Sequence, residues 1–202
     1  MKPRRLVLAI SLGSALLLSV SAVNAATLTF AANLSGANEV PPNASPGTGN
    51  VTVVLDTIAE TLKIDGSFSN LTSNTTMAHI HCCAPLGTNA GVATVPPTFT
   101  GFPLGVTSGT FSGTLNLLDP ASYNPPFIAA NGGTAAAAAV VLMNGIINGQ
   151  SYFNIHTVNI GGGEIRGQLA AVPLPAALPL FATGLGALGL IGWRRRKKAA
   201  SV

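Results

Sequence analysis

The chain has 202 residues and a net charge of +4, with 48% hydrophobic and only 8% charged residues. The positive charge belongs to the two ends, because the body between Ala26 and Ala171 holds six acidic residues and only two basic ones, Lys63 and Arg166. An acidic body lacks the basic surface that phosphate backbones require, which excludes nucleic acid as a partner. The body is long enough for one domain with its own core.

The first 25 residues have the pattern of a secretory signal peptide. Arg4 and Arg5 precede an apolar run from Leu6 to Val20, and Val23-Asn24-Ala25 fits a cleavage site with small or aliphatic residues at −3 and −1. An N-terminal membrane anchor is the alternative. We expect signal peptidase to remove residues 1–25, so that the body functions outside the cytoplasm.

The body, residues 26–171, alternates apolar and polar residues in short runs, a pattern typical of β-strands. These runs cover residues 28–34, 51–56, 62–68, 111–117, 152–158 and 165–169. Glycine-rich turn sequences such as Asn131-Gly132-Gly133 and Gly161-Gly162-Gly163 lie between them. The body is therefore predicted to be all-β, a Greek-key-like β-sandwich or barrel.

One segment departs from the strand pattern. Ala135–Met143 reads AAAAAVVLM, and alanine favours helix whereas Val140 and Val141 favour strand. We predict a short helix, with a buried strand as the alternative. The proline pairs Pro96-Pro97 and Pro125-Pro126 are expected in surface loops.

The histidines offer the clearest chemistry. His79 and His81 stand two residues apart, so on a strand both imidazoles project from one face while Ile80 enters the core. His156 could supply a third ligand if its strand pairs with theirs. Imidazole suits Zn and Cu, which predicts a possible metal site. The alternative is that the rings hydrogen-bond to backbone, Thr or Asn groups.

Cys82 and Cys83 directly follow these histidines and are the chain's two cysteines. In an oxidising compartment we expect them to form a disulfide with each other. Such a ring has eight members and is strained, so it is more easily reduced than an ordinary disulfide. Metal ligation beside His81, or a disulfide to another chain, are the alternatives.

Glu164 and Arg166 alternate onto one face of a late strand. A salt bridge from Arg166 to Glu164 or to another carboxylate is one interpretation, and an anion-binding role is the other. The sequence has no Ser-His-Asp order, phosphate loop or paired-carboxylate signature. We therefore expect a binding or structural protein and no enzyme, with a metal-dependent redox enzyme of superoxide-dismutase-like type as the alternative.

The last segment, residues 172–202, combines three features in order. Residues 176–193 form an apolar stretch long enough for a membrane span, and residues 194–198 form a basic cluster. The motif before the span and the arginines after it are Val172, Pro173, Leu174, Pro175, Arg194, Arg195 and Arg196. This order resembles the PEP-CTERM sorting tail of Gram-negative bacteria, although Leu174 stands where the name-giving motif has glutamate.

That resemblance implies an exosortase that recognises and cleaves the tail. The protein would be anchored transiently in the inner membrane and then reach the cell surface or an extracellular matrix. Extracellular polysaccharide or protein would be its partner there.

Four short motifs in the body, in this order and spacing, resemble the CHRD domain, a module named after chordin. They are NEVPP at residues 38–42, AHIH at 78–81, NIHT at 154–157 and GGEIRGQL at 162–169. The resemblance covers nearly the whole body and implies an extracellular, β-rich domain. In chordin the module belongs to a protein that binds growth factors, which favours interaction over catalysis. Where the family usually continues AHIH with glycine, this chain has Cys82.

Overall fold

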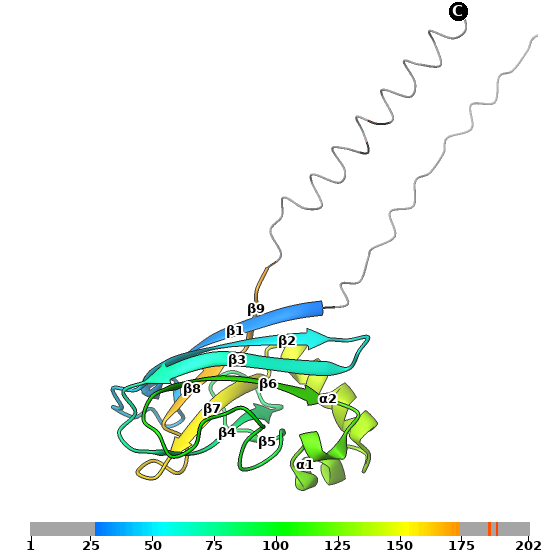
Figure 1. Ribbon diagram of the computed structural model, residues 1–202. Helices are drawn as coiled ribbons and strands as arrows, with labels where there is room; N and C mark the ends of the chain where they lie inside the picture. Colours follow the sequence, from blue (N-terminus) through cyan, green and yellow to red (C-terminus); the bar gives the residue numbers. More distant parts are fainter. Residues whose placement is uncertain (1–26, 174–185, 187–188, 190–202) are drawn as a thin grey trace, which may run out of the picture.

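A computed structural model describes residues 27–173, together with Gly186 and Gly189 (Figure 1). In this part of the chain nine strands form one antiparallel sheet of order β5-β4-β7-β8-β1-β2-β3-β6, with β9 paired to β1. The strands are β1 (Thr27–Ser35), β2 (Thr48–Asp56), β3 (Thr61–Ser69), β4 (Thr75–Cys82), β5 (Gly91–Val92), β6 (Gly109–Asn116), β7 (Ser151–Thr157), β8 (Ile165–Gln168) and β9 (Ala170–Ala171). The helices are η1 (Gly36–Asn38), η2 (Pro120–Ser122), α1 (Pro125–Ala130) and α2 (Ala135–Ile147). The body is predicted to be an all-β sandwich or barrel; the structure is mostly β, a curled antiparallel sheet with few helices.

The sheet curls so that its two halves enclose one core (Figure 1). Phe111 on β6 and Phe153 on β7 stack with ring centroids 5.4 Å apart, although four strands separate β6 from β7 in the sheet. Phe99 lies edge-on to Phe111, and its ring is also 6.3 Å from that of Phe153. Stacked and edge-on aromatic pairs bury large apolar surfaces, so this cluster stabilises the curl.

The long strands β1, β2, β3 and β6 follow the alternating sequence directly. Leu55 lies opposite Leu62, and Val53 lies opposite Ile64, all four fully buried on the inner face. Along the four strands, the residues that alternate with the buried ones point outward and are mostly Thr, Ser and Asn. Because register fixes which face every side chain takes, the apolar pattern alone positions this half of the sheet.

A long loop covers the edge of β4 that the short strand β5 leaves open. The Ala78 amide donates to the Pro97 carbonyl at 3.1 Å, and the Thr75 amide donates to the Val106 carbonyl at 2.9 Å. The Gly105 amide in turn donates to the Thr75 carbonyl at 2.9 Å. Covering an edge in this way satisfies backbone groups that would otherwise be free to pair with another chain.

The two α-helices, α1 and α2, lie together at one end of the sheet (Figure 1). The prediction of a helix from Ala135 is confirmed, and α2 continues to Ile147. The Thr134 hydroxyl accepts from the Ala137 amide at 3.2 Å and caps its first turn. The prediction of a surface loop at Pro125-Pro126 is wrong: these prolines begin α1, where a missing N–H costs no hydrogen bond.

The two ends of the described domain lie side by side, because Phe30 on β1 is paired with Ala171 on β9. The predicted signal peptide, the apolar stretch 176–193 apart from Gly186 and Gly189, and the basic cluster 194–198 lie outside the described residues. So do Leu174 and Pro175, whereas Val172 is half exposed and donates its amide to the Thr29 carbonyl. Within the residues that are described, no helix is long and apolar enough to cross a membrane.

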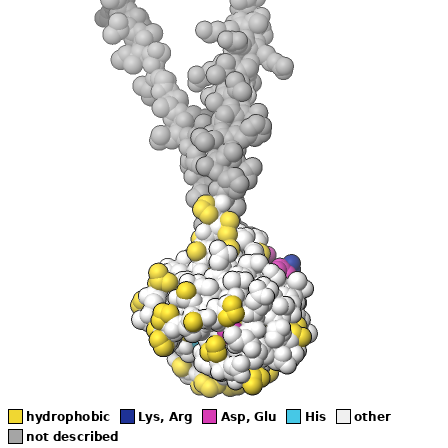
Figure 2. All heavy atoms as spheres, turned by 90° about the vertical axis from the view of Figure 1, so that its left-hand side faces the viewer, with side chains coloured by type: hydrophobic (Ala, Val, Ile, Leu, Met, Phe, Trp, Pro, Cys, Tyr) yellow, Lys and Arg dark blue, Asp and Glu magenta, His cyan; other side chains and the backbone are white. Residues whose placement is uncertain are grey.

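The face seen in Figure 2 carries very few charged side chains, and its apolar side chains are scattered. This agrees with the low content of charged residues in the chain. Neutral polar groups therefore dominate what this face presents to a partner.

Helix α2 packs directly on a disulfide between Cys82 and Cys83. Gly145 permits this contact: a Cβ there would overlap Cys82 Sγ and lie 2.6 Å from Cys83 Sγ. The position is therefore closed to any larger residue unless helix and disulfide move apart.

We predict that Gly145→Ala destabilises the domain by about 1–3 kcal/mol, the usual cost of overpacking. Alanine is the better helix former by roughly 1 kcal/mol, so a net loss reflects the crowding of the new Cβ against the two sulfurs and, less closely, Ser151 Oγ. Urea unfolding of the oxidised protein measures it. Gly162→Ala is the control, since a Cβ there meets no atom within 4 Å and should change little. A variant at Gly145 as stable as the wild type would show that α2 does not press on the disulfide.

Candidate metal centre

The pairing of β4 with β7 brings the three histidines together. His79 lies opposite Asn154, His81 opposite Tyr152, and Met77 opposite His156 in the antiparallel register. Ile80, between the two histidines of β4, is fully buried in the core on the other face. The histidines therefore lie on the outer face of the sheet.

That outer face is nonetheless buried, because loops cover it. His79, His81 and His156 are only 2%, 8% and 5% exposed. The cover consists of the segment around η1, the loop between β4 and β5, and the turn between β7 and β8. These loops are joined to the sheet and to each other: Asn89 Nδ2 donates to the Val40 carbonyl at 2.9 Å, and Asn43 Nδ2 to the Glu164 carbonyl at 3.0 Å.

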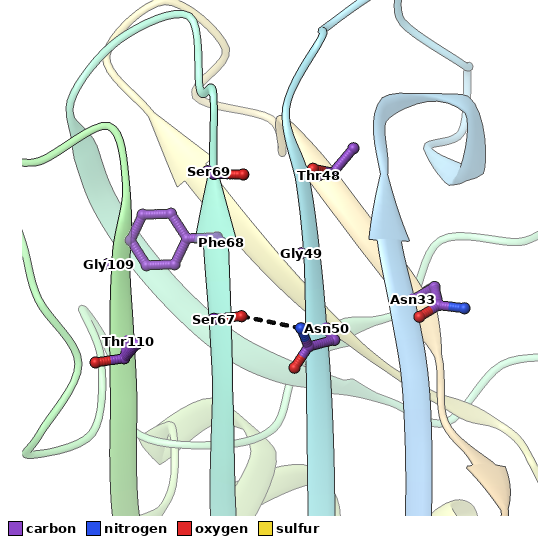
Figure 3. Close-up of a pocket in the computed structure, with 9 residues that line it drawn as sticks. All are labelled: Asn33, Thr48, Gly49, Asn50, Ser67, Phe68, Ser69, Gly109 and Thr110. Carbon is purple, nitrogen blue, oxygen red and sulfur yellow. Dashed lines mark hydrogen bonds between the residues drawn. The ribbon is translucent and has the colours of Figure 1, made fainter.

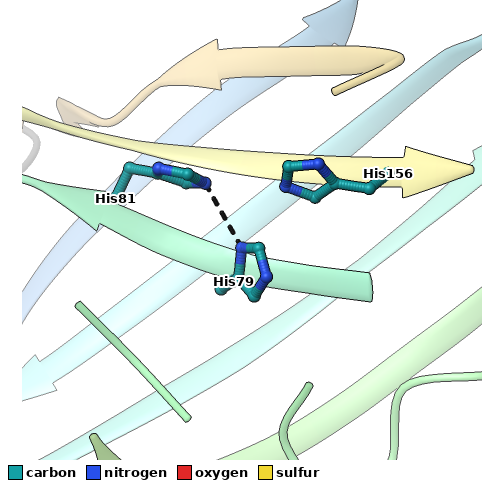
Figure 4. Close-up of side chains that lie close together, drawn as sticks. All are labelled: His79, His81 and His156. Atoms are coloured by element: carbon teal, nitrogen blue, oxygen red, sulfur yellow. Dashed lines mark hydrogen bonds between the residues drawn. The ribbon is translucent and has the colours of Figure 1, made fainter. Parts of the chain in front are cut away.

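The three imidazoles form one compact cluster (Figure 4). Nδ1 of His79 is 3.2 Å from Nε2 of His81. The ring centroid of His79 is 4.7 Å from that of His156, and one nitrogen from each ring can be chosen so that all three lie within 4.8 Å of one another. Bonds from nitrogen to zinc are about 2.0–2.1 Å, so a shared ion would require the more distant rings to move closer together.

Two of the rings are held by the backbone in the orientation that a metal ligand needs. His81 Nδ1 is 2.9 Å from the Ala90 carbonyl, and His156 Nδ1 is 3.0 Å from the Gly161 carbonyl. A carbonyl can only accept, so both Nδ1 atoms carry the proton and both Nε2 atoms have a lone pair. The lone pair of His81 Nε2 accepts from Nδ1 of His79. Nε2 of His156 is buried without a hydrogen-bond partner. A ligand whose other nitrogen donates to a carbonyl is the usual arrangement in protein metal sites, so these residues fit a transition-metal ion.

Burial keeps the rings in the neutral form. Burial, with a smaller contribution from His156 and His81, lowers the pKa of His79 to about 3. Burial also lowers the pKa of His81 to about 4, against the opposing effect of the Ala90 carbonyl. The pKa of His156 is also lowered by burial, against the opposing effect of the Gly161 carbonyl. Neutral imidazole is the form that binds a metal, so the cluster can bind near pH 7 without first releasing protons into solvent.

A buried stack of side chains extends from His81 across the sheet. The His81 and Tyr152 rings are stacked with centroids 4.7 Å apart. The guanidinium of Arg166, on the neighbouring strand β8, lies 4.4 Å from the centre of the Tyr152 ring. The Tyr152 hydroxyl accepts from the Ala90 amide at 3.1 Å. The hydroxyl also donates to the Ala90 carbonyl at 3.4 Å, so Tyr152 contacts the same carbonyl that orients His81.

Arg166 is paired with Glu39, not with Glu164. Its Nε is 3.9 Å from Glu39 Oε2 and donates to the Asn38 carbonyl at 2.7 Å, while Nη1 donates to Asn89 Oδ1 at 2.8 Å. Burial raises the pKa of Glu39 to about 7, although Arg166 and a hydrogen bond from Asn154 act against this. Glu39 Oε1 and Asn154 Oδ1 are buried without hydrogen-bond partners. Unpaired buried oxygens therefore gather beside Arg166, in the layer of polar side chains that covers the outer face of β7 and β8.

Glu164 has a separate structural role. Its carboxylate accepts from the hydroxyls of Ser45, Thr72 and Thr157 at 2.6, 3.0 and 2.5 Å and from the Thr72 amide at 2.6 Å. Burial alone would raise its pKa, but these hydrogen bonds outweigh burial and lower it. Glu164 thus ties the loop after η1 and the loop before β4 to the end of β7.

The cysteines do not join the histidine cluster. Cys82 follows His81 on the same strand and therefore points to the opposite face, where it belongs to the apolar core. Cys83 is exposed at the end of the strand. Their disulfide lies against α2, on the other side of the sheet from the three imidazoles.

Sequence reasoning missed Glu39, Tyr152 and Asn154 as neighbours of the site. Two signals were available. Glu39 is the charged residue of the NEVPP motif in a body with very few charges, and Tyr152 and Asn154 share the strand alternation of His156. Neither signal could show that the segment around Glu39 folds over the face of β7.

Away from the histidines, a hollow of about 640 Å³ lies on the outer face of β1, β2, β3 and β6 (Figure 3). Asn33, Asn50, Ser67 and Thr110 are aligned across the four strands, and Asn50 Nδ2 donates to Ser67 Oγ at 2.9 Å. The hollow is lined by no titratable side chain. The polar side chains of this hollow are therefore all neutral and can contact a ligand only through hydrogen bonds.

The metal-free domain is expected to lose stability as the pH falls from 6.5 toward 4. Unfolded histidine takes up a proton near pH 6.5, whereas the folded cluster resists protonation because its pKa values are lowered. The unfolded state therefore binds more protons in this range, and acid favours unfolding. Urea midpoints measured at half-unit pH intervals in EDTA test this.

Glu39 acts in the opposite direction and provides the control. Its raised folded pKa means that the native state takes up a proton between about pH 7 and 4.5, which stabilises it on acidification. Glu39→Gln removes this opposing group, so the acid destabilisation should become steeper. A flat pH profile in both proteins would show that the three histidines are not buried as neutral rings.

Comparison with known families bears on the whole domain. The CHRD domain family matches residues 30–169, a range that includes all three histidines, both cysteines, Glu39 and Arg166. A search of curated proteins found no match. The match spans more than half of the chain and begins and ends within the curled sheet, at Phe30 on β1 and Leu169 just before β9. The chain belongs to the CHRD domain family.

Proposed function

We propose that this chain is an exported bacterial protein with a binding or structural role at the cell surface or in the extracellular matrix, and that its histidine cluster holds one transition-metal ion. The observation that carries the metal assignment is the convergence of three neutral imidazoles, two of them oriented by backbone carbonyls, around an unpartnered Nε2. Zn²⁺ and copper ions are the candidates, since both bind imidazole nitrogen well.

Burial favours a metal that stabilises the domain over one that performs catalysis. The three rings are no more than 8% exposed, and loops from three parts of the chain cover them. A redox enzyme of superoxide-dismutase-like type needs a position where its substrate reaches the metal. A buried ion would instead fasten the cover loops to β4 and β7, because Ala90 and Gly161 hold two of its ligands.

A neutral partner agrees best with the surface. The hollow in Figure 3 offers aligned amide and hydroxyl groups without charge. Such groups suit an extracellular polysaccharide, or an uncharged protein surface, better than a charged ligand.

Metal addition should stabilise the protein. A ligand that binds only the native state adds about 2.7 kcal/mol when its free concentration is 100 times Kd. We expect one Zn²⁺ or Cu²⁺ per chain by elemental analysis after equilibration, and a thermal midpoint that rises with metal and falls again with EDTA. His81→Ala and His156→Ala should each weaken binding by at least about 100-fold, because losing a ligand costs more than losing its hydrogen-bond partner.

Thr114→Ala, an exposed change on β6, is the matched control and should bind metal like the wild type. The metal assignment fails if neither ion binds the wild type in stoichiometric amount. It also fails if both histidine variants keep the wild-type affinity, since the ion would then be held elsewhere.

Export is tested by the intact mass of the protein from its native host. We expect residues 1–25 to be absent, which reflects signal peptidase, and the segment after Pro175 to be absent from the released form, which reflects exosortase. Retention of residues 1–25 would contradict export through a cleaved signal peptide. Retention of residues 176–202 alone would indicate a permanent membrane anchor in place of a sorting tail.

A further inference from the structure

A pocket of about 370 Å³ lies at the helical end of the domain, on the side of the sheet opposite to the histidines. The disulfide, β5, α1 and α2 surround it, and its lining includes Cys82, Cys83, Val92, Asn124, Phe127 and Val141. Its volume is within the range of small-molecule sites, roughly 300–1,000 Å³. No charged residue lines it.

The disulfide forms one wall of this pocket and is in contact with the helix that forms another. Cys83 Sγ is 3.7 Å from the Val141 carbonyl, and Gly145 leaves no space between α2 and the two sulfurs. The separation of α2 from β4 is therefore set by the joined sulfur pair. Two separate thiols lie further apart than two bonded sulfurs, so reduction changes this wall of the pocket.

The polar groups of the pocket are two side-chain amides at the ends of α1. Asn124 Nδ2 donates to the Val92 carbonyl at 3.2 Å, and Asn131 Nδ2 donates to the Phe127 carbonyl at 2.8 Å. These bonds fix the direction of both amides. Among the described residues no donor contacts either Oδ1, so both oxygens remain able to accept from a ligand.

The remaining lining is apolar or sulfur. Phe127 provides an aromatic ring, Pro126 and Val141 provide aliphatic surface, and the disulfide is polarisable. A pocket that combines apolar side chains with two fixed acceptors suits a ligand with an apolar body and hydroxyl donors. A charged ligand would lose its hydration here without gaining a partner of opposite charge.

We propose that this pocket is a second binding site, independent of the metal centre, for a small neutral aromatic alcohol, and that it is competent only while Cys82 and Cys83 are joined. The ring lies among Phe127, Val141 and the disulfide, and its hydroxyls donate to the two asparagine oxygens. Binding is non-covalent and leaves the disulfide intact.

Resorcinol, a flat ring with two hydroxyls, is the probe. Isothermal titration of the oxidised full-length protein, kept in EDTA so that no metal is bound, should show one site. Val141→Phe places a larger side chain in the pocket and should weaken binding at least tenfold. Val140→Phe is the matched control, because Val140 is adjacent on α2 but 54% exposed and does not line the pocket. Its affinity should equal that of the wild type.

Reduction provides the second measurement. After treatment with a phosphine reductant, with two free thiols confirmed by labelling, resorcinol binding should be lost while the far-ultraviolet circular dichroism stays β-dominated. In oxidised protein, Asn131→Ala should weaken resorcinol binding without closing the pocket. This variant tests the site if Val141→Phe does not fold.

Absence of binding to oxidised wild type at millimolar resorcinol would overturn the site. Equal affinity in wild type, Val141→Phe and Asn131→Ala would place the ligand elsewhere and would also overturn it. Undiminished binding after reduction would overturn the dependence on the disulfide. None of these outcomes bears on metal binding, which is measured separately.

Discussion

The antiparallel pairing of β4 with β7 is the interaction on which the rest of this structure depends. It joins two segments about 70 residues apart and places AHIH beside NIHT in a register that aligns their polar faces. The same pairing sends Ile80, Phe153 and Ile155 into the core. Because side chains alternate strictly along a strand, one register creates the apolar core on one face and the histidine cluster on the other.

The polar layer outside β4, β7 and β8 is costly to bury, and its contacts show how the cost is offset. Arg166, one of only two basic residues in the body, is 4% exposed and is held by Glu39, Asn38 and Asn89. Glu164 receives four hydrogen bonds from neutral donors. Groups of this kind stabilise a fold only when nearly every partner is present, so the loops that supply the partners become part of the domain. The unpartnered atoms of Glu39, Asn154 and His156 remain in and beside the histidine cluster.

Strand alternation also separates two chemistries that are adjacent in sequence. His81 faces the polar layer and the other two histidines, while Cys82, the next residue, faces the core and α2. The disulfide and the histidines therefore belong to different sites on opposite sides of one sheet. This makes ligation of a shared metal by Cys82 and His81 incompatible with the oxidised structure.

The sequence by itself determined the strand positions of the long β-hairpins, the helix from Ala135 and the common face of His79 and His81, because periodicity and local propensity act over a few residues. It also indicated a mostly β fold and resemblance to the CHRD domain. Only the tertiary structure decided that His156 joins the cluster, that Glu39 and not Glu164 pairs with Arg166, and that the face of the histidines is buried. These outcomes depend on which distant strands pair and on how the loop around η1 folds back over β7. Local sequence carries no signal for either, since contacts across the curl form between residues far apart along the chain.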